Sequence, residues 1–318
     1  MQTQTARQWM VTHEWMVKPM HQTEWIERQG VLVWLAEVFS ALGTGLYLAA
    51  LFVGSWWGTL FGWLIVVLLK LPLHLLYLGK PLRFWRTLPP FSGAWKTSWI
   101  ARGVLFTTVF VAIGFVQLVT SHIIAGTTLL TGQALTGLIA LDMLVRVLAG
   151  IFVILTGVYC GFMMSYCKSV PFWNTGLLPI VVLNAGIADG LALVMGVGVL
   201  TGGMDFHPLE SAIRITLGIN TVLLATYLLN ATYQSQTAEQ SVWELVVGRF
   251  SITFWVGIVV CGIFVPLVIS FASLSAGNGS IPLLLGAITC HTIGAFALKY
   301  CLLKAGVHKP ILLRTIVS

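Results

Sequence analysis

The sequence is poor in charged residues. Only 8% of its 318 residues are Asp, Glu, Lys or Arg, whereas a soluble domain carries about 25%. No long polar stretch separates its apolar runs, which argues against a soluble appendage. Its five cysteines form no Cys-x-x-Cys pair, and an iron–sulfur cluster needs four thiolates at tight spacings. We therefore expect one integral membrane domain that holds no cluster of its own.

Hydrophobic residues make up 58% of the chain and fall into runs of the roughly 20 residues that one spanning helix needs. The predicted spans are residues 31–54, 57–79, 99–125, 134–166, 174–201, 209–234, 250–275 and 280–304. The expected fold class is an all-α integral membrane protein with eight transmembrane helices in two four-helix bundles. We expect an interfacial segment at 1–30, the membrane domain at 31–304 and a tail at 305–318.

The cations are unequally distributed between the two sides of this membrane domain. Eight spans place both termini and three connections on one side, and 13 of the 17 Lys and Arg residues fall there. The positive-inside rule makes this side, and hence both termini, cytoplasmic. A basic loop that docks a partner would produce the same bias. The net charge of +7 is thus a topology signal and no argument for nucleic-acid binding.

Ionisable residues inside membrane spans are costly and usually functional. Glu37, His74 and Tyr159 lie on three predicted helices at one depth below the basic side, as judged from the helical rise. Lys70 is four residues before His74, hence on the same helix face, and Pro72 between them can kink the helix. Together they predict a polar pocket. Alternatively, Lys70 only snorkels, His74 bonds a neighbouring helix and Tyr159 belongs to the aromatic belt.

Further ionisable residues lie deeper in the predicted membrane domain. Asp142 and Arg146 are four residues apart on the fourth span, which suits an ion pair that is either structural or part of a proton path. Asp189 has no cation adjacent in sequence, so it either stays protonated or belongs to a proton path. His74, His122 and His291 lie at different depths, which disfavours haem, and no metal site is predicted.

The segment from Tyr159 to Leu193, YCGFMMSYCKSVPFWNTGLLPIVVLNAGIADGLAL, resembles the central motifs of the polysulfide reductase membrane-subunit family (NrfD/PsrC). That family shows Y-T-G-x-L-L-S, then P-x-W-N, then L-P-x-x-F-x-x-S-G. HLLYLGKPLRFWR and TSWIARG are similar to its loop between helices 2 and 3, and LGTGLYL is similar to its small-residue motif. The resemblance covers about the first 200 residues. This sequence departs from the pattern at Cys160, Ala185 and Asp189.

The resemblance implies an eight-helix membrane anchor without haem or iron–sulfur cluster, in the cytoplasmic (inner) membrane of a bacterium or archaeon. Such anchors exchange electrons between menaquinone or ubiquinone and an iron–sulfur partner of the ferredoxin-like, four-cluster type. The chemistry, often of anaerobic respiration, lies in a molybdopterin or similar catalytic subunit, so this chain would not be catalytic alone. Tyr159 corresponds to the family's quinone-contacting tyrosine.

The depth argument adds further residues to the expected quinone site, namely His74, Lys70 and Glu37. The candidate proton path comprises Asp189, Asp142 and Arg146. The basic exit from the second helix is interpreted as the docking site of the iron–sulfur partner, where arginines pair with acidic groups. The docking residues are Lys80, Arg83, Arg86 and Arg102. The alternative is a plain cytoplasmic loop that sets topology.

Two rival hypotheses remain for the whole chain. A proton-coupled secondary transporter would use Asp189 and the Asp142–Arg146 pair as its coupling site. Transporters of this kind usually show inverted repeats and paired broken helices. No clear repeat is seen here, although Pro179 and Pro266 are candidate breaks. The other rival is an anchor of purely structural role, in which changes in the polar pocket would leave electron flow unchanged.

Overall fold

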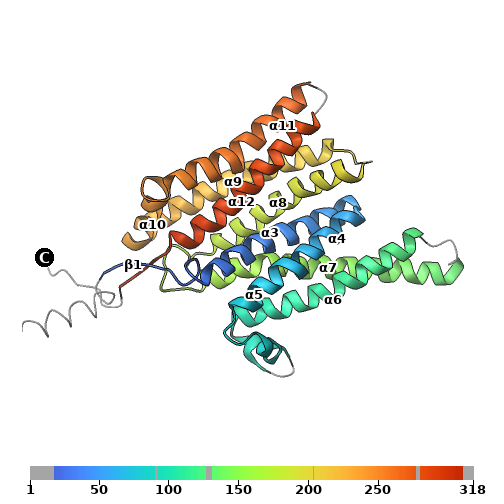
Figure 1. Ribbon diagram of the computed structural model, residues 1–318, viewed down its shortest axis with the longest axis horizontal. Helices are drawn as coiled ribbons and strands as arrows, with labels where there is room; N and C mark the ends of the chain where they lie inside the picture. Colours follow the sequence, from blue (N-terminus) through green and yellow to red (C-terminus); the bar gives the residue numbers. More distant parts are fainter. Residues whose placement is uncertain (1–17, 90–91, 127–130, 203, 277–279, 311–318) are drawn as a thin grey trace, which may run out of the picture.

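The computed structural model describes residues 18–89, 92–126, 131–202, 204–276 and 280–310. Within these ranges, eight helical segments are long and apolar enough to cross a membrane, close to the predicted bounds. Most of the expected interfacial segment, residues 1–17, lies outside the described residues. The elements are β1 (Met20–His21), α3 (Gly30–Val53), α4 (Trp56–Leu64), η1 (Ile65–Lys70), α5 (Leu71–Tyr77), η2 (Pro81–Thr87), η3 (Ala94–Lys96), α6 (Trp99–Gly126), α7 (Gly132–Ser165), α8 (Leu177–Thr201), α9 (His207–Gln234), α10 (Gln236–Val246), η4 (Thr253–Phe264), α11 (Val265–Ala276), α12 (Ile281–Lys304) and β2 (Val307–His308) (Figure 1).

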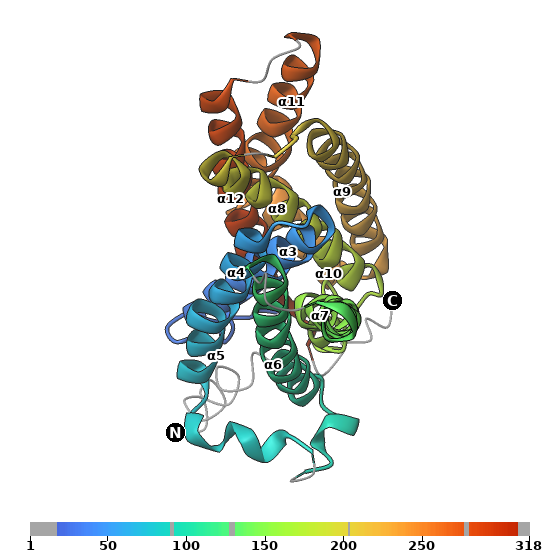
Figure 2. The ribbon, with the colours of Figure 1, turned by 90° about the vertical axis from the view of Figure 1, so that its right-hand side faces the viewer.

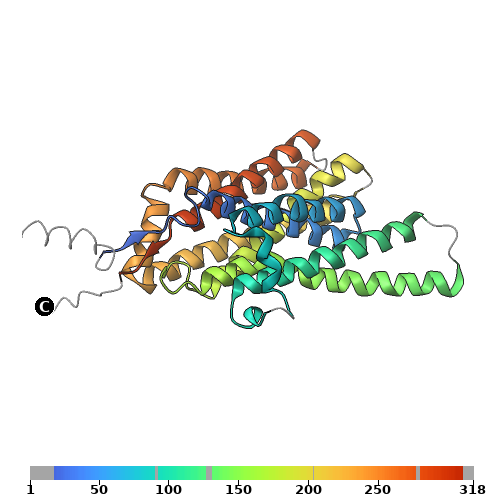
Figure 3. The ribbon, with the colours of Figure 1, turned by 60° about the horizontal axis from the view of Figure 1, so that its bottom comes forward.

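The spans form two groups that meet along α3 and α8. The first group contains α3, the continuous segment α4–η1–α5, α6 and α7, and the second contains α8, α9, the segment η4–α11 and α12. Figure 2 shows α3 and α8 between the outer helices of the two groups. The α6–α7 hairpin extends beyond the other spans at one end (Figures 1 and 3). This arrangement agrees with the predicted eight-helix, all-α membrane fold.

Glycines allow α3 and α8 to touch through their backbones. A Cβ on Gly190 would lie 2.0 Å from the carbonyl oxygen of Gly45, and a Cβ on Gly45 would lie 2.0 Å from that of Gly186. No side chain fits at such distances, so small residues are required at this crossing, as is common between membrane helices. Gly45 belongs to the LGTGLYL segment, which therefore serves helix packing.

Two spans contain a π-helical stretch just before a proline. Proline has no N–H and its ring obstructs the preceding turn. In η1, ahead of Pro72, the N–H of Leu71 bonds to the carbonyl of Val66, five residues back. The stretch η4 stands in the same position relative to Pro266. The expected disturbance at Pro72 thus takes the form of a widened helix, a feature frequent at functional sites.

Both described ends of the chain lie at one end of the molecule, which we call the terminal end; the opposite end is the far end. Strand β1 pairs antiparallel with β2, and the amphipathic helix α10 lies beside this pair (Figure 1). The sequence did not predict α10, because it is short and its apolar face is narrow. The shared end agrees with an even number of spans.

The P-x-W-N motif builds part of the terminal end. The indole N–H of Trp173 donates to the carbonyl of Leu302 at 2.7 Å, and the amide of Asn174 donates to the carbonyl of Ser165 at 2.5 Å. Trp173 is fully buried and packs against Trp25 with 5.0 Å between ring centroids. These contacts tie the connection between α7 and α8 to the end of α12, so the motif is structural.

Three side chains clamp strand β1 to α10 and to the turn that follows α10. Arg249 donates to Glu244 at 3.0 Å and to Nε2 of His21 at 2.6 Å. Burial and the charge of Arg249 lower the pKa of His21 below its ordinary value of 6.5. Burial opposes ionisation of Glu244, but the hydrogen bonds and charge of Arg249 outweigh it and hold the Glu244 pKa below 4.5.

Acidification is expected to loosen this clamp. Because His21 binds a proton more readily when released, the clamp is fully stable above pH 6.5 and weakens as the pH falls toward the lowered His21 pKa. Glu244 adds the same trend below pH 4.5, since its pKa is depressed in the clamp. Hydrogen exchange of residues 19–23, corrected for its intrinsic pH dependence, should rise on acidification. His21→Asn should remove the part of this rise that begins below pH 6.5. Exchange that does not change with pH in the native protein would contradict the prediction.

Candidate functional site

Three of the predicted pocket residues meet below the terminal end. The hydroxyl of Tyr159 on α7 lies 2.6 Å from Nε2 of His74 on α5 and 3.4 Å from Oε1 of Glu37 on α3. His74 Nε2 and Glu37 Oε1 are 3.7 Å apart. A phenol, an imidazole and a carboxyl from three helices thus share one polar centre. We call it the Tyr159 cluster, and it includes Lys70.

Lys70 joins the cluster from the end of the π-helical stretch η1. Its Nζ lies 2.5 Å from Oγ1 of Thr107 on α6 and 5.2 Å from the centroid of the Tyr159 ring. Gly103, one turn before Thr107, makes room for that ring, because a Cβ there would lie 2.4 Å from a ring carbon. The helix α6 therefore supports both the ammonium and the aromatic ring.

The cluster is buried except on the His74 side. Glu37 and Lys70 are each 2% exposed and Tyr159 is 3% exposed, whereas 30% of the His74 side chain is accessible. Burying a carboxylate or an ammonium alone is costly, so the two opposite charges support each other here. A ligand arriving from outside the protein would meet His74 first and Tyr159 directly behind it.

Sequence reasoning missed three neighbours of this cluster. Thr107 holds Lys70, as described, and the thiol of Cys160 interacts electrostatically with Glu37. Lys299 on α12 is 5% exposed and interacts electrostatically with Glu37. Lys299 lies five residues from the terminal-end boundary of its helix, at the depth of the other members. The depth argument could therefore have found Lys299, whereas Thr107 carries no such signal.

Aromatic residues line the side of the cluster nearest the terminal end. The Trp99 ring stacks on Phe162 with 4.7 Å between centroids and 6° between planes, and Tyr166 lies 5.6 Å from Trp99. The guanidinium of Arg102 lies 4.5 Å from the Trp99 ring centroid. The indole Nε1 of Trp99 is buried without a hydrogen-bond partner. On α6 and α7, Trp99 and Phe162 lie about one turn from Gly103 and Tyr159 toward the terminal end.

The predicted docking cations lie in or next to the connection from α5 to α6, which we call the basic loop (residues 78–98). Lys80, Arg83 and Arg86 are exposed on it, and Leu82 among them is 87% exposed. Arg102, just after the loop, donates instead to carbonyls of the loop itself, at 2.9 Å and 2.6 Å. Arg102 therefore fixes the shape of the loop, while the other three cations project from it.

Asp142 and Arg146 form the expected pair on α7, with 2.5 Å between Nε and Oδ2. The other carboxylate oxygen accepts from the hydroxyls of Thr120 and Ser121 on α6, each at 2.7 Å. This network gives both carboxylate oxygens of Asp142 a partner and joins α6 to α7. It lies apart from Asp189, so the structure does not bring the three candidate proton-path residues together.

Asp189 on α8 has a partner that its sequence neighbours do not reveal. Its Oδ1 lies 3.0 Å from Nε2 of His291 on α12. Both side chains are buried, and neither contacts the Tyr159 cluster. Asp189 and His291 lie roughly 12 and 13 residues from the terminal-end boundaries of their helices. Their equal depth could therefore have been recognised from the sequence. Asp189 thus belongs to a second polar centre, closer to the far end.

The arrangement of the Tyr159 cluster suits proton-coupled chemistry on a ligand with hydrogen-bond acceptors. The phenol and imidazole can each donate or accept, and the carboxyl next to them can take up or release a proton. Two ammonium groups offset the carboxylate charge. The cluster also lies at a depth that a membrane-dissolved molecule reaches without entering water.

Comparison with known proteins identifies similar sequences. The family model described as "Polysulphide reductase, NrfD" matches residues 57–310. The match includes the last three spans, which lie beyond the first 200 residues covered by the sequence motifs. It covers most of the protein.

Curated relatives are matched over part of their length. "Protein NrfD" of Escherichia coli is 29% identical over 173 residues, which cover 52% of each of the two proteins. The C subunit of polysulfide reductase from Wolinella succinogenes is 28% identical over 159 residues, or 47% of this protein and 49% of the relative. "Protein NrfD homolog" of Haemophilus influenzae is 25% identical over 171 residues, 51% of this protein and 52% of the relative. The matched regions span about half the length of these relatives.

Proposed function

Because the chain belongs to the polysulphide reductase family NrfD, we propose that it is the membrane anchor subunit of a respiratory oxidoreductase. It exchanges electrons between the membrane quinone pool, menaquinone or ubiquinone, and an iron–sulfur partner subunit. The substrate chemistry then takes place in a further, molybdopterin-type subunit. One observation carries this proposal, the meeting of Tyr159, His74 and Glu37 within hydrogen-bonding distance at a membrane-accessible depth.

The chemistry of a quinone matches these groups. Its carbonyl oxygens accept hydrogen bonds, and its two-electron reduction takes up two protons. Tyr159 and His74 supply the donors and sit at the accessible side of the cluster. Glu37, 3.4 Å behind the Tyr159 hydroxyl, relays protons between the quinone site and water. The nearby ammonium of Lys70 favours the negative charge that develops on a quinone oxygen.

The basic loop is the proposed docking surface of the iron–sulfur partner. Lys80, Arg83 and Arg86 are exposed on it and suit an acidic rim, which arginine binds in two-pronged fashion. Leu82, almost fully exposed between them, is an apolar side chain that a partner surface would cover. The loop joins α5, which carries His74, to α6, which carries Thr107. By the positive-inside rule, this terminal end faces the cytoplasm.

Purification of the intact assembly in mild detergent tests the proposed function. A tagged chain should retain quinone, found by solvent extraction, and an iron–sulfur subunit, found by mass spectrometry and iron analysis. Tyr159→Phe and His74→Ala should lower the quinone content while the partner remains. Replacing Arg83 and Arg86 with Glu should release the partner while quinone remains. A folded chain that yields neither quinone nor iron would overturn the proposal.

A further inference from the structure

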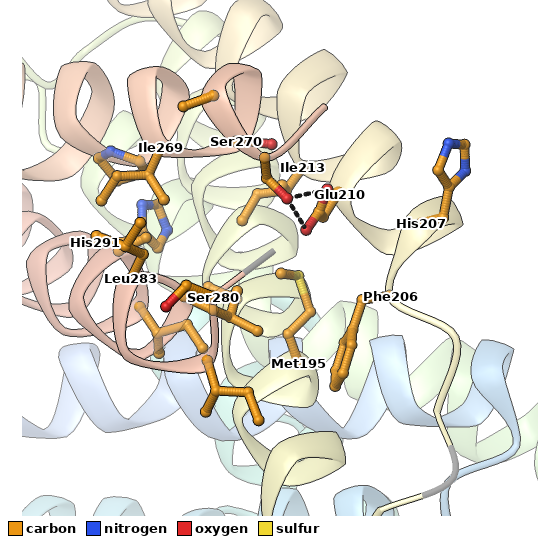
Figure 4. Close-up of a pocket in the computed structure, with 18 of the residues that line it drawn as sticks. Met195, Phe206, His207, Glu210, Ile213, Ile269, Ser270, Ser280, Leu283 and His291 are labelled. Carbon is orange, nitrogen blue, oxygen red and sulfur yellow. Dashed lines mark hydrogen bonds between the residues drawn. The ribbon is translucent and has the colours of Figure 1, made fainter. Parts of the chain in front are cut away.

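A cavity of about 620 Å³ opens at the far end between α8, α9, α11 and α12. Its walls are mostly apolar, with Met195, Ile213 and Leu283 among them, while Glu210 and His291 are polar groups in its lining (Figure 4). The volume exceeds that of a water molecule many times. His291 is ten residues into α12 from its far-end start, roughly 15 Å by the helical rise.

His291 is held in one orientation by the carbonyl group of Gly262. Pro266 cannot donate a hydrogen bond to this carbonyl. Since proline has no N–H, the carbonyl of Gly262, four residues before it, lacks its α-helical donor. Nδ1 of His291 lies 2.8 Å from this oxygen, and because a carbonyl only accepts, Nδ1 carries the hydrogen. Nε2 is thereby turned toward Asp189, 3.0 Å away.

At this distance Nε2 of His291 is not aligned for a hydrogen bond with the carboxyl, so the interaction between the two side chains depends on their charges. A neutral His291 with hydrogen on Nδ1 presents a lone pair at Nε2, which an ionised Asp189 would repel. The contact is favourable when the proton sits either on the carboxyl or on Nε2. Asp189 is 3% exposed and His291 is 5% exposed, so an unpaired charge at this depth would be costly. The pair is a buried proton-binding site.

The imidazole also stands between two cavities. A second cavity of about 20 Å³ is lined by Asp189, Asn220 and His291, and it is large enough for one water molecule. Among the described residues, His291 lines both this small cavity and the large one. Ala185 borders the small cavity on the side of the Tyr159 cluster, and its methyl group cannot hold a proton.

We propose that the far-end cavity is a water-filled inlet through which protons reach the Asp189–His291 pair from the far end. Hydronium in the cavity gives one proton to the pair and leaves as water, and release follows the reverse route. The inlet ends at this pair, because Asp189 and His291 are the titratable side chains among the described residues that line the small cavity. This proton site goes beyond the quinone chemistry of the proposed function and does not depend on it.

The surroundings of the pair suit this role. From α9, Glu210 lines the cavity. Arg214 lies 3.8 Å from Glu210 and donates to the hydroxyl of Ser270, another lining residue, at 3.0 Å. Glu210 also accepts from Ser273 on α11 (Figure 4). The described part of η4–α11 contributes the carbonyl of Gly262 and no charged side chain. A polar, hydrogen-bonded wall thus runs beside an apolar lining toward the buried pair.

Cysteine labelling tests the inlet in the full-length protein. Ser273→Cys lies in the cavity wall and Ala287→Cys lies one turn from His291. A charged, membrane-impermeant methanethiosulfonate is added to either face of sealed vesicles, and each labelled peptide is identified by mass spectrometry. Both cysteines should react from the far-end face alone. Ile293→Cys, on a 51% exposed position outside the cavity lining, is the lipid-facing control and should not react. Arg83→Cys marks the terminal-end face.

Infrared difference spectroscopy tests the proton site itself. When the pH is changed at the far-end face of sealed vesicles, difference bands should appear that Asp189→Asn abolishes. The same change at the terminal-end face should leave these bands absent. Ala287→Phe, which fills the inlet, should abolish their fast appearance. The proposal would be overturned if Ala287→Cys were labelled from the terminal-end face, or if it were not labelled from either face in a folded protein. Infrared difference bands that survive in Asp189→Asn would also overturn it.

Discussion

In the purified assembly, Tyr159→Phe is expected to lower quinone-linked turnover by about 100-fold. The change removes only the hydroxyl that lies 2.6 Å from His74 and 3.4 Å from Glu37. A positioned donor or acid of this kind contributes about 10²–10³ to the rate. Because the aromatic ring stays against Gly103, the fold should be unaffected. Steady-state kinetics with a soluble quinone analogue should show the loss in kcat/KM.

His74→Ala should reduce turnover by a similar factor, and the double variant should lose little more than either single one. Residues that act as a unit are strongly non-additive. The matched control is Tyr227→Phe, since Tyr227 is also fully buried and donates to the carbonyl of Phe172 at 2.7 Å. It should cost about 1 kcal/mol of stability and leave turnover unchanged. Full activity in folded Tyr159→Phe would rule out the proposed role of this hydroxyl.

Gly190→Ala is expected to destabilise the fold by more than about 3 kcal/mol. The new methyl group would lie 2.0 Å from the Gly45 carbonyl oxygen, so α3 and α8 must separate. Overpacking usually costs about 1–3 kcal/mol of stability. A substitution that forces two backbones apart should cost as much as the upper end of this range or more. The yield of monodisperse protein and the melting temperature in detergent should both fall sharply.

Other glycines supply the controls for this experiment. Gly294→Ala should behave like Gly190→Ala, because its Cβ would lie 2.2 Å from the Cα of Gly262. Gly218→Ala meets nothing within 4 Å and should change stability by less than about 1 kcal/mol, in the stabilising direction of helix propensity. Equal melting temperatures for the Gly190 and Gly218 variants would contradict the packing argument.

The spans were predictable because hydropathy and length alone define them. The Asp142–Arg146 pair was predictable too, since its spacing of four residues is local. Glu37, His74 and Tyr159 could be grouped because the helical rise converts sequence position into depth. Depth, however, does not say which helices are neighbours. Only the packing of the spans decides that these three side chains touch.

The interactions that the sequence could not supply depend on helix neighbours. Asp189 and His291 share a depth, but their contact requires α8 beside α12 and the turn that the Gly262 carbonyl imposes on the imidazole. Thr107 was missed because threonine is ordinary in a membrane helix. The P-x-W-N segment marked the family correctly, yet Trp173 packs the terminal end and takes no part in the Tyr159 cluster.

The backbone contact between α3 and α8 has a mechanical consequence. Glu37 lies on α3, and Asp189 is the residue next to the touching Gly190 on α8. A transporter of the alternating-access type must rock one half of its bundle against the other, which would pull this contact open. The two halves instead touch backbone to backbone near the middle of α3 and α8. This contact favours a fixed separation between the two polar centres, over which we expect any coupling to be electrostatic.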